Sequence, residues 1–411
     1  MTDTRQADIR NLMKRVEQLV REIQTEDEVG ITIYNLADAI ISRFRDALGF
    51  YGGRLYQWDG EAYELKATFP NARPAEREIR VPATYAPIEI ALEEGVVYMD
   101  SSDPRFDHQF EEQIGVDRFA AIEVGEEEFI LSFDVAPGVR RDDVLFSLGV
   151  LRHGINQRLR QERMQEVFDQ ARKIQASILP RRTPVYGGFE LYGRIQPMES
   201  VGGDFYDYIP ITDKILGLAI ADVSGHGLPA ALQVRDIYMG LRMGMARDFK
   251  IVRTVERLNQ IIHKSTLTSR FVSMFYGELE PNGVFIYVNA GHPPPFHLSA
   301  AGEVRYLDEG GAVLGPLAEA TYERGFVRLA PGDMVVLYTD GMIEATPPEG
   351  DGEEFGIERL VEIARRLQGK SSKEIGEAMM KAVEAYRGDG EAQDDRTVVV
   401  VTYPQASGGT P

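Results

Sequence analysis

Four short acidic motifs constrain this chain most strongly, because three of them adjoin apolar runs that read as buried strands. Asp222 ends the run GLAIAD, Asp340 ends MVVLYTD, and Asp394 and Asp395 belong to DDRT, directly before VVVVT. The fourth motif, VGGDFYD, contains Asp204 and follows another strand-like run. Each aspartate-glycine pair alone is typical of a turn. A carboxylate beside a core is costly unless it is paired or metal-bound, so the four motifs together favour a metal cluster.

The remaining composition indicates which metal to expect. The chain has no cysteine and six histidines among 411 residues, which excludes disulfides, thiolate metal sites and a cysteine nucleophile. Carboxylate oxygens suit hard divalent cations, so we expect Mn²⁺ or Mg²⁺. The absence of cysteine also agrees with a reducing compartment, and we expect a cytoplasmic protein.

The charge balance excludes two classes of partner. With 45 Lys plus Arg against 65 Asp plus Glu, the formal net charge is −20. An acidic chain is unsuited to electrostatic capture of nucleic acid or of an anionic membrane. No apolar run approaches the ~20 residues that a membrane helix needs. We therefore expect a soluble protein, with two or three domains for its length.

The N-terminal part is expected to contain a helix and a sensor domain. Residues 1–27 carry a heptad-like apolar seam, which predicts an amphipathic or coiled-coil helix that either packs on its own domain or forms a homodimer seam. Residues 28–150 alternate helices and short strands in an order that resembles a GAF domain, a sensor of α/β/α architecture. That resemblance implies a small-molecule or protein signal, although a GAF-like fold that binds no ligand is equally compatible with the sequence.

A long helical linker is predicted over residues 151–180. Its apolar positions form two stripes, and a five-residue step between Leu159 and Met164 separates them across the polar run RQER. Such a step rotates the apolar face, so one straight helix cannot bury both stripes in one groove. We expect one stripe to dock on the sensor and the other on the C-terminal domain. A passive spacer helix is the alternative.

Five motifs after residue 180 carry a family resemblance. VGGDFYD, ADVSGHGLPAAL, NAGHPPP, YTDGMIEA and DDRT, in this order, resemble the PPM family of metal-dependent serine/threonine protein phosphatases, in its bacterial SpoIIE/RsbU branch. The resemblance implies an α/β/β/α sandwich of two antiparallel sheets over residues 181–404, with a metal centre at one edge. Residues 405–411 would be a disordered tail. The expected fold class of the whole chain is α+β.

The resemblance also implies a ligand set. Asp222 would bridge two metal ions, Asp204 and the backbone carbonyl of Val223 would complete one site, and Asp340 and Asp394 would complete the other. Two metals held in this way lower the pKa of a bridging water, which attacks phosphorus in line.

The chain departs from the family pattern at two places. In the eukaryotic members the acid histidine follows the bridging aspartate by two positions, where this chain has Ser224; His226 is therefore only a candidate general acid, and His292 is expected to order a loop. Those members also hold the phosphate with an arginine shortly before the first aspartate. Here the nearest upstream arginine is Arg194, so phosphate binding is expected to rest on the metals.

Two aspartates beside the expected ligands are predicted to be structural. Asp207 and Asp395 are expected to face away from the Asp204 and Asp394 side chains, so Asp395→Ala is expected to be milder than Asp394→Ala.

The resemblance implies a function. The chain would be a serine/threonine protein phosphatase regulated by its GAF-like sensor, with a phosphorylated STAS-domain anti-anti-sigma factor as substrate in a partner-switching stress or sigma-factor pathway. The alternative is an inactive phosphatase fold that acts as a scaffold, and retention of all four aspartates argues against it.

Overall fold

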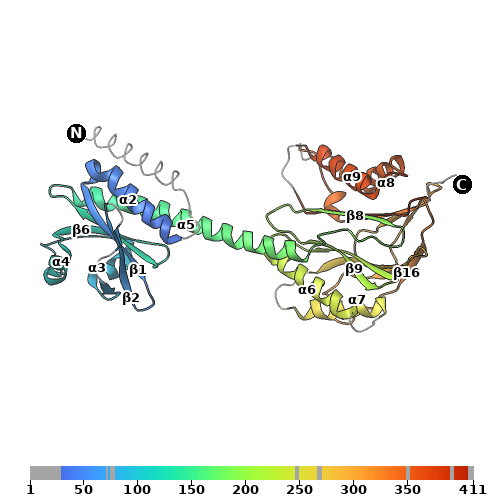
Figure 1. The fold of residues 1–411 in the computed structure, drawn as a ribbon, viewed down its shortest axis with the longest axis horizontal. Coiled ribbons are helices and arrows are strands. Elements are labelled where there is room, and N and C mark those ends of the chain that lie inside the picture. Colours follow the sequence, from blue (N-terminus) through green and yellow to red (C-terminus); the bar gives the residue numbers. More distant parts are fainter. Residues whose placement is uncertain are drawn as a thin grey trace. The chain divides into compact units, whose positions relative to one another are not determined.

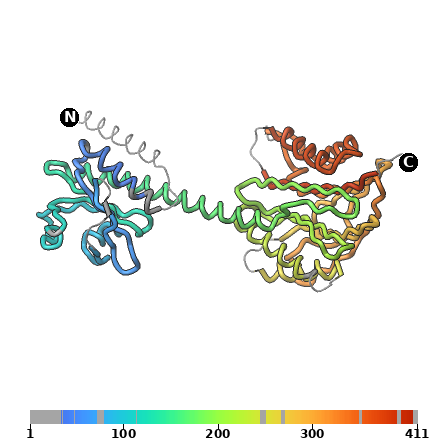
Figure 2. The backbone as a smooth tube through the Cα atoms, viewed as in Figure 1, coloured from blue at the N-terminus to red at the C-terminus, as the bar shows by residue number. Residues whose placement is uncertain are grey.

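The computed structural model describes residues 29–70, 73–74, 79–245, 250–265, 271–348, 352–388 and 393–405. The chain divides into two compact units, Met1–Glu166 and Val167–Pro411 (Figures 1 and 2), which are described separately here. The helix predicted over residues 1–27, and all but the first residue of the predicted tail, lie outside the described residues. No described helix combines the length and apolarity that a membrane crossing requires.

The N-terminal unit has a central sheet with helices on both faces. The strand order is β3-β2-β1-β7-β6-β5, with β4 paired to β2. The strands are β1 (Phe50–Trp58), β2 (Ala62–Phe69), β3 (Arg73–Pro74), β4 (Arg80–Pro82), β5 (Val96–Asp100), β6 (Arg118–Val124) and β7 (Phe129–Val135). One core lies between the sheet and helices α2 (Val29–Leu48) and α5 (Arg141–Ile178). A second core lies under α3 (Ala86–Glu94) and α4 (His108–Ile114). The unit thus has three layers, and its assignment as GAF-like stays a prediction.

The C-terminal unit contains two stacked sheets. The first has the order β15-β12-β11-β10-β9, with β16 paired to β12, and the second has the order β14-β13-β17-β18-β8. The first sheet comprises β9 (Asp204–Thr212), β10 (Ile215–Val223), β11 (Val272–Leu279), β12 (Val284–Ala290), β15 (Gly310–Gly311) and β16 (Gly325–Arg328). The second comprises β8 (Glu190–Gln196), β13 (Phe296–Leu298), β14 (Val304–Tyr306), β17 (Met334–Tyr338) and β18 (Arg396–Thr402).

Helices cover both outer faces of this pair of sheets. An inner core joins residues of both sheets, such as Ile220 and Val399. The outer face of the first sheet packs against α6 (Leu228–Met245) and α7 (Ile251–Lys264), and that of the second against α8 (Ile357–Arg366) and α9 (Ser372–Arg387) (Figure 1). The expected four-layer arrangement is present, except that β12 and β15 pair in parallel. This pairing departs from the fully antiparallel sheets that were predicted.

Helix α5 buries its first apolar stripe and exposes most of its second. The first stripe, Leu148 to Leu159, belongs to the core of the N-terminal unit. In the second stripe, Met164, Val167 and Ile174 are exposed. Val167 and Ile174 belong to the C-terminal unit, so the prediction that this stripe docks there is wrong for these two side chains. Ile178, at the end of the stripe, does pack against the core of that unit.

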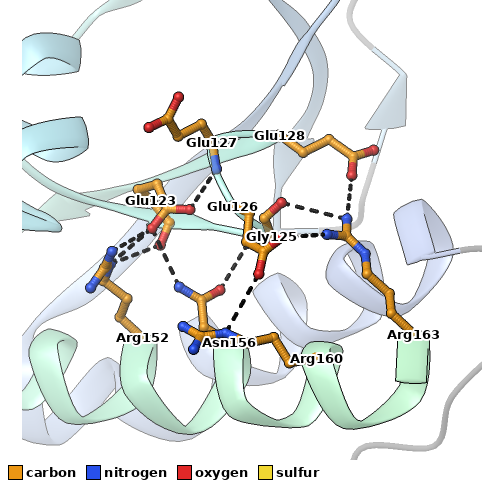
Figure 3. Close-up of polar contacts among 9 residues, drawn as sticks. All are labelled: Glu123, Gly125, Glu126, Glu127, Glu128, Arg152, Asn156, Arg160 and Arg163. Carbon is orange, nitrogen blue, oxygen red and sulfur yellow. Dashed lines mark hydrogen bonds and ion pairs between the residues drawn. The ribbon is translucent and has the colours of Figure 1, made fainter. Parts of the chain in front are cut away.

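The polar run between the stripes contacts the turn that joins β6 to β7 (Figure 3). From this run, Arg163 donates from Nη2 to Glu128 Oε2 at 2.7 Å. About one turn earlier on the helix, Asn156 Oδ1 accepts from Gly125 N at 2.8 Å. Within the turn, Glu126 and Glu127 have positive φ values of 61° and 70°. A non-glycine residue holds this conformation only when surrounding contacts fix it. The polar run therefore ties helix α5 to a strained turn of the sheet.

Candidate metal centre

The predicted aspartates lie at neighbouring strand ends. Asp222, near the end of β10, pairs directly with Asp204 at the start of β9. Asp340 follows β17, and Asp394 precedes β18, the strand beside β17. The charges of Asp340 and Asp394 act on Asp222. The charge of Asp222 in turn acts on Asp204. The two stacked sheets therefore bring four carboxylates together from positions far apart in the sequence.

Burial and mutual repulsion perturb these carboxyl groups. Burial, and after it the charges of Asp340 and Asp394, raise the pKa of Asp222 to about 8. Burial also raises the pKa of Asp204 well above its ordinary value, and the pKa values of Asp340 and Asp394 rise for the same reason. Carboxylates that repel one another suit a divalent cation, because its charge removes the repulsion and its ligands are oxygens. Sequence reasoning missed Glu344, whose charge also acts on Asp222.

The donor types fit hard divalent ions, because all four side chains are carboxylates. Among the described residues, no three histidine or carboxylate side chains converge closely enough to hold an ion. Asp204 Oδ2 instead accepts hydrogen bonds from Thr339 Oγ1 at 2.8 Å and from Thr397 Oγ1 at 2.6 Å. Its role as a direct ligand, like that of the Val223 carbonyl, stays a prediction.

Two glycines let the loop before Asp204 approach its neighbours closely. A Cβ atom on Gly203 would lie 2.7 Å from the carbonyl oxygen of Val223, and one on Gly202 would lie 2.1 Å from Asp395 Oδ2. Side chains at either position would clash, since real Cβ contacts are essentially never under 3.0 Å. Gly203 therefore lets the Asp204 loop lie against Val223, and Gly202 lets it lie against Asp395.

The side chain of Asp395 anchors this loop by accepting hydrogen bonds from the backbone of the loop. Its Oδ1 accepts from the Met198 N–H at 2.7 Å, and its Oδ2 accepts from Gly203 at 2.5 Å. The carboxylate is buried, with 3% of the residue exposed. The burial and these bonds support a structural role for Asp395, so its removal is expected to cost stability. That Asp395→Ala is milder than Asp394→Ala in activity stays a prediction. Asp207 is also structural, because its Oδ2 accepts from Arg242 Nη2 at 2.8 Å.

Helix α5 reaches the same loop through Gln175, which sequence reasoning missed. Gln175 Nε2 donates to the carbonyl of Gly202 at 2.7 Å, and Gln175 Oε1 accepts from Gly202 N at 3.3 Å. The residue is buried, while its neighbour Ile174 is exposed. A buried glutamine beside an exposed isoleucine reverses the pattern that hydropathy alone predicts. For this reason Gln175 could not be identified from the sequence.

The two histidines of the motifs differ in environment. His226 is exposed, and its Nδ1 lies 2.6 Å from Glu199 Oε1, which orients the ring. His292 is buried and its Nδ1 lies 2.8 Å from Ser273 Oγ. Burial lowers the pKa of His292 to about 3, so the ring is neutral near pH 7. Since Ser273 pairs with Asp222 across the sheet, His292 supports the strand that carries Asp222.

The C-terminal part of the chain is similar to known proteins. Residues 212–404 match the family described as Stage II sporulation protein E (SpoIIE). Phosphoserine phosphatase RsbU of Bacillus subtilis (strain 168) is 27% identical over 251 residues, which cover 60% of this chain and 72% of RsbU. Protein IcfG of Synechocystis sp. (strain ATCC 27184 / PCC 6803 / Kazusa) is 28% identical over 228 residues, which cover 47% of this chain and 35% of IcfG.

Solved structures support the fold of the C-terminal unit. The SiaA-PP2C domain of Pseudomonas aeruginosa matches with a TM-score of 0.53 and 22% identity, over 58% of this chain and 97% of that domain. At this identity the match identifies the architecture alone.

Proposed function

We propose that this chain, which matches the SpoIIE family over residues 212–404 and is related to RsbU, hydrolyses phosphoserine or phosphothreonine in a partner protein. The observation that carries the proposal is the gathering of Asp204, Asp222, Asp340 and Asp394 at adjoining strand ends. Such a cluster of repelling carboxylates suits a two-metal hydrolytic site.

We assign the roles of the residues as follows. Asp222 would bridge two Mn²⁺ or Mg²⁺ ions, with Asp204 and the Val223 carbonyl on one side and Asp340 and Asp394 on the other. When bound, such ions supply an activated water and neutralise charge on the phosphate. His226 is the candidate general acid, because Glu199 orients its ring on the loop that follows Asp222.

The proposed substrate is a phosphorylated STAS-domain anti-anti-sigma factor in a partner-switching pathway. The support for this substrate is the relation to RsbU and the SpoIIE family. The second candidate function, a scaffold without activity, is disfavoured because the four aspartates are retained.

The decisive experiment measures hydrolysis by the full-length protein. We expect turnover of p-nitrophenyl phosphate and of a phosphoserine STAS protein in the presence of Mn²⁺, and none after chelation. Absence of hydrolysis of both substrates with Mn²⁺ and with Mg²⁺ would favour the scaffold. Turnover of the small ester alone would retain the phosphatase and remove the STAS substrate.

We also propose that the protein is a homodimer through helix α5. Met164, Val167, Ala171 and Ile174 follow steps of three, four and three, the spacing of a coiled-coil seam. Three of these side chains are half exposed or more, at 60%, 51% and 53% for Met164, Val167 and Ile174. A second copy of the same stripe is the partner that this spacing suits.

The dimer is tested by changing one seam position. Val167→Glu should shift the mass measured by light scattering from about twice 46.0 kDa toward one chain, because it places like charges opposite each other. Gln170→Glu, at an exposed position off the seam, is the matched control and should leave the dimer intact. A wild-type protein that scatters as one chain at micromolar concentration contradicts the dimer.

The sensor is proposed to act on the metal centre through helix α5. In the N-terminal unit, Arg163 and Asn156 tie the helix to the β6–β7 turn; in the C-terminal unit, Gln175 binds the loop before Asp204. The cavity of the N-terminal unit, lined by Arg54 and Glu111 among others, has a volume of about 30 Å³. A space of this size holds no more than a few waters, so we favour a protein signal over a small molecule.

Gln175 gives this regulation a direct test. Gln175→Ala removes both hydrogen bonds to Gly202, so the loop that carries Asp204 loses its outer support. We expect the Mn²⁺ concentration for half-maximal activity to rise about 10- to 100-fold, the range for lost outer-shell support of a metal ligand, with a smaller change in kcat. Gln170→Ala, on an exposed face of the same helix, should leave the metal requirement unchanged. Equal metal titrations for both variants would make the helix a passive spacer.

A further inference from the structure

A second charged feature adjoins the proposed metal centre. A cavity of about 100 Å³ is lined by two carboxylates, Asp394 and Glu344, and by two guanidinium groups, Arg387 and Arg396. Because a water molecule occupies about 30 Å³ in the liquid, this cavity could hold a group the size of about three waters.

Arg396 is the unusual member of this lining. It is the first residue of β18, and Val398 and Val400, two and four residues further on the same face, pack in the core under α8 and α9. Only 3% of Arg396 is exposed. Its Nη1 atom is buried and makes no hydrogen bond to any part of the chain that the structure describes.

A buried guanidinium in this position needs an anion. Arg387 and Arg194 act on Arg396 with like charge, and Glu384 is the acidic group that opposes them. Burying a charge without a hydrogen-bonded counter-charge is costly. Cations at the proposed metal centre would neutralise in part the two carboxylates that line the cavity, which would leave the guanidinium of Arg396 without an opposing charge there.

We propose that Arg396 forms an oxyanion subsite that takes the phosphate group of the substrate beside the metal centre. This proposal rests on the phosphatase function proposed above. Arg396 would take the role of the phosphate-binding arginine that this chain lacks shortly before Asp204. A guanidinium suits this role, because its planar fork donates two parallel hydrogen bonds to a phosphate. The subsite would also hold the inorganic phosphate that hydrolysis releases.

The first test measures phosphate binding without turnover. Full-length protein with Mg²⁺ is dialysed against radiolabelled inorganic phosphate. Arg396→Gln should weaken binding about 10- to 100-fold, the factor for one charge-assisted hydrogen bond, whereas Arg366→Gln, at an exposed position of α8, should bind as the wild type does. Arg396→Lys keeps the charge but loses the fork, so its affinity should fall between the two. Phosphate affinities of Arg396→Gln and Arg396→Lys equal to that of the wild type would overturn the subsite. If the glutamine variant does not fold, the lysine variant decides.

The second test separates substrate from free phosphate. In hydrolysis of a phosphoserine peptide, Arg396→Gln should raise KM and the inhibition constant of phosphate by similar factors, with a smaller effect on kcat. A rise in the inhibition constant alone would assign the subsite to the product and overturn its role toward substrate. If the protein hydrolyses nothing, the dialysis result still decides whether Arg396 binds phosphate, so the two proposals fail separately.

Discussion

Asp222→Asn should abolish metal-dependent hydrolysis while leaving the fold intact. Asp222 is the one residue proposed to contact both ions, and loss of an outer-shell partner alone typically costs 10- to 100-fold. We therefore expect activity to fall by more than about a hundredfold at saturating Mn²⁺. The measurement is the rate of ester hydrolysis together with circular dichroism. Turnover near that of the wild type would refute the two-metal assignment.

The same variant should be more stable than the wild type when metal is absent. Burial and neighbouring charges raise the pKa of Asp222 from 3.8 to about 8. Between these two pH values the folded protein holds a proton on Asp222 that the unfolded chain has lost, so the free energy of unfolding falls as pH rises through this window. Asparagine carries no titrating proton and removes this dependence.

Urea unfolding in a chelator at pH 5 and pH 8 measures the effect. The wild type should lose stability, on the order of a few kcal/mol, between these pH values. Asp222→Asn should lose less, and added Mg²⁺ should reduce the loss in the wild type. A steeper loss of stability with pH in the variant would contradict the electrostatic account of the site.

Alanine substitutions of the neighbours Asp394 and Asp395 should have different effects: the first should abolish activity, and the second should lower stability. Asp395 accepts hydrogen bonds from the backbone of Met198 and Gly203 in a buried position. Its replacement by alanine leaves buried N–H groups without partners, so we expect a loss of about 3 kcal/mol of unfolding free energy. Asp394→Ala should abolish hydrolysis with little loss of stability, because its carboxylate is repelled by the others.

Denaturant unfolding and metal titration of both variants provide the check. At low temperature, where Asp395→Ala is still folded, it should retain measurable Mn²⁺-dependent turnover. If Asp395→Ala were the inactive but stable variant of the two, the ligand would be Asp395. The sequence alone predicted a milder effect for Asp395→Ala than for Asp394→Ala. We keep this order for activity, and the buried hydrogen bonds of Asp395 add an expected loss of stability.

Local chemistry in the sequence was sufficient to predict the chemical type of the site. Asp222, Asp340 and Asp394 each adjoin a strand, and apolar runs of that length pack in a core wherever the chain folds. The carboxylates that stand at the ends of these strands can therefore be identified from the sequence. The same holds for the first stripe of helix α5, since its period of 3.6 fixes which face is apolar.

Contacts between distant segments were decided only by the tertiary structure. Gln175 binds Gly202, Asp395 holds the Asp204 loop, and Arg396 faces a cavity beside Asp394. None of these follows from periodicity, because hydropathy records whether a side chain prefers water and not which polar group it meets. The second stripe of α5 makes the same point: its apolar pattern predicted docking, yet Ile174 is exposed and Gln175 is buried. The sequence determined which residues could do chemistry, and the stacking of the two sheets decided which of them meet.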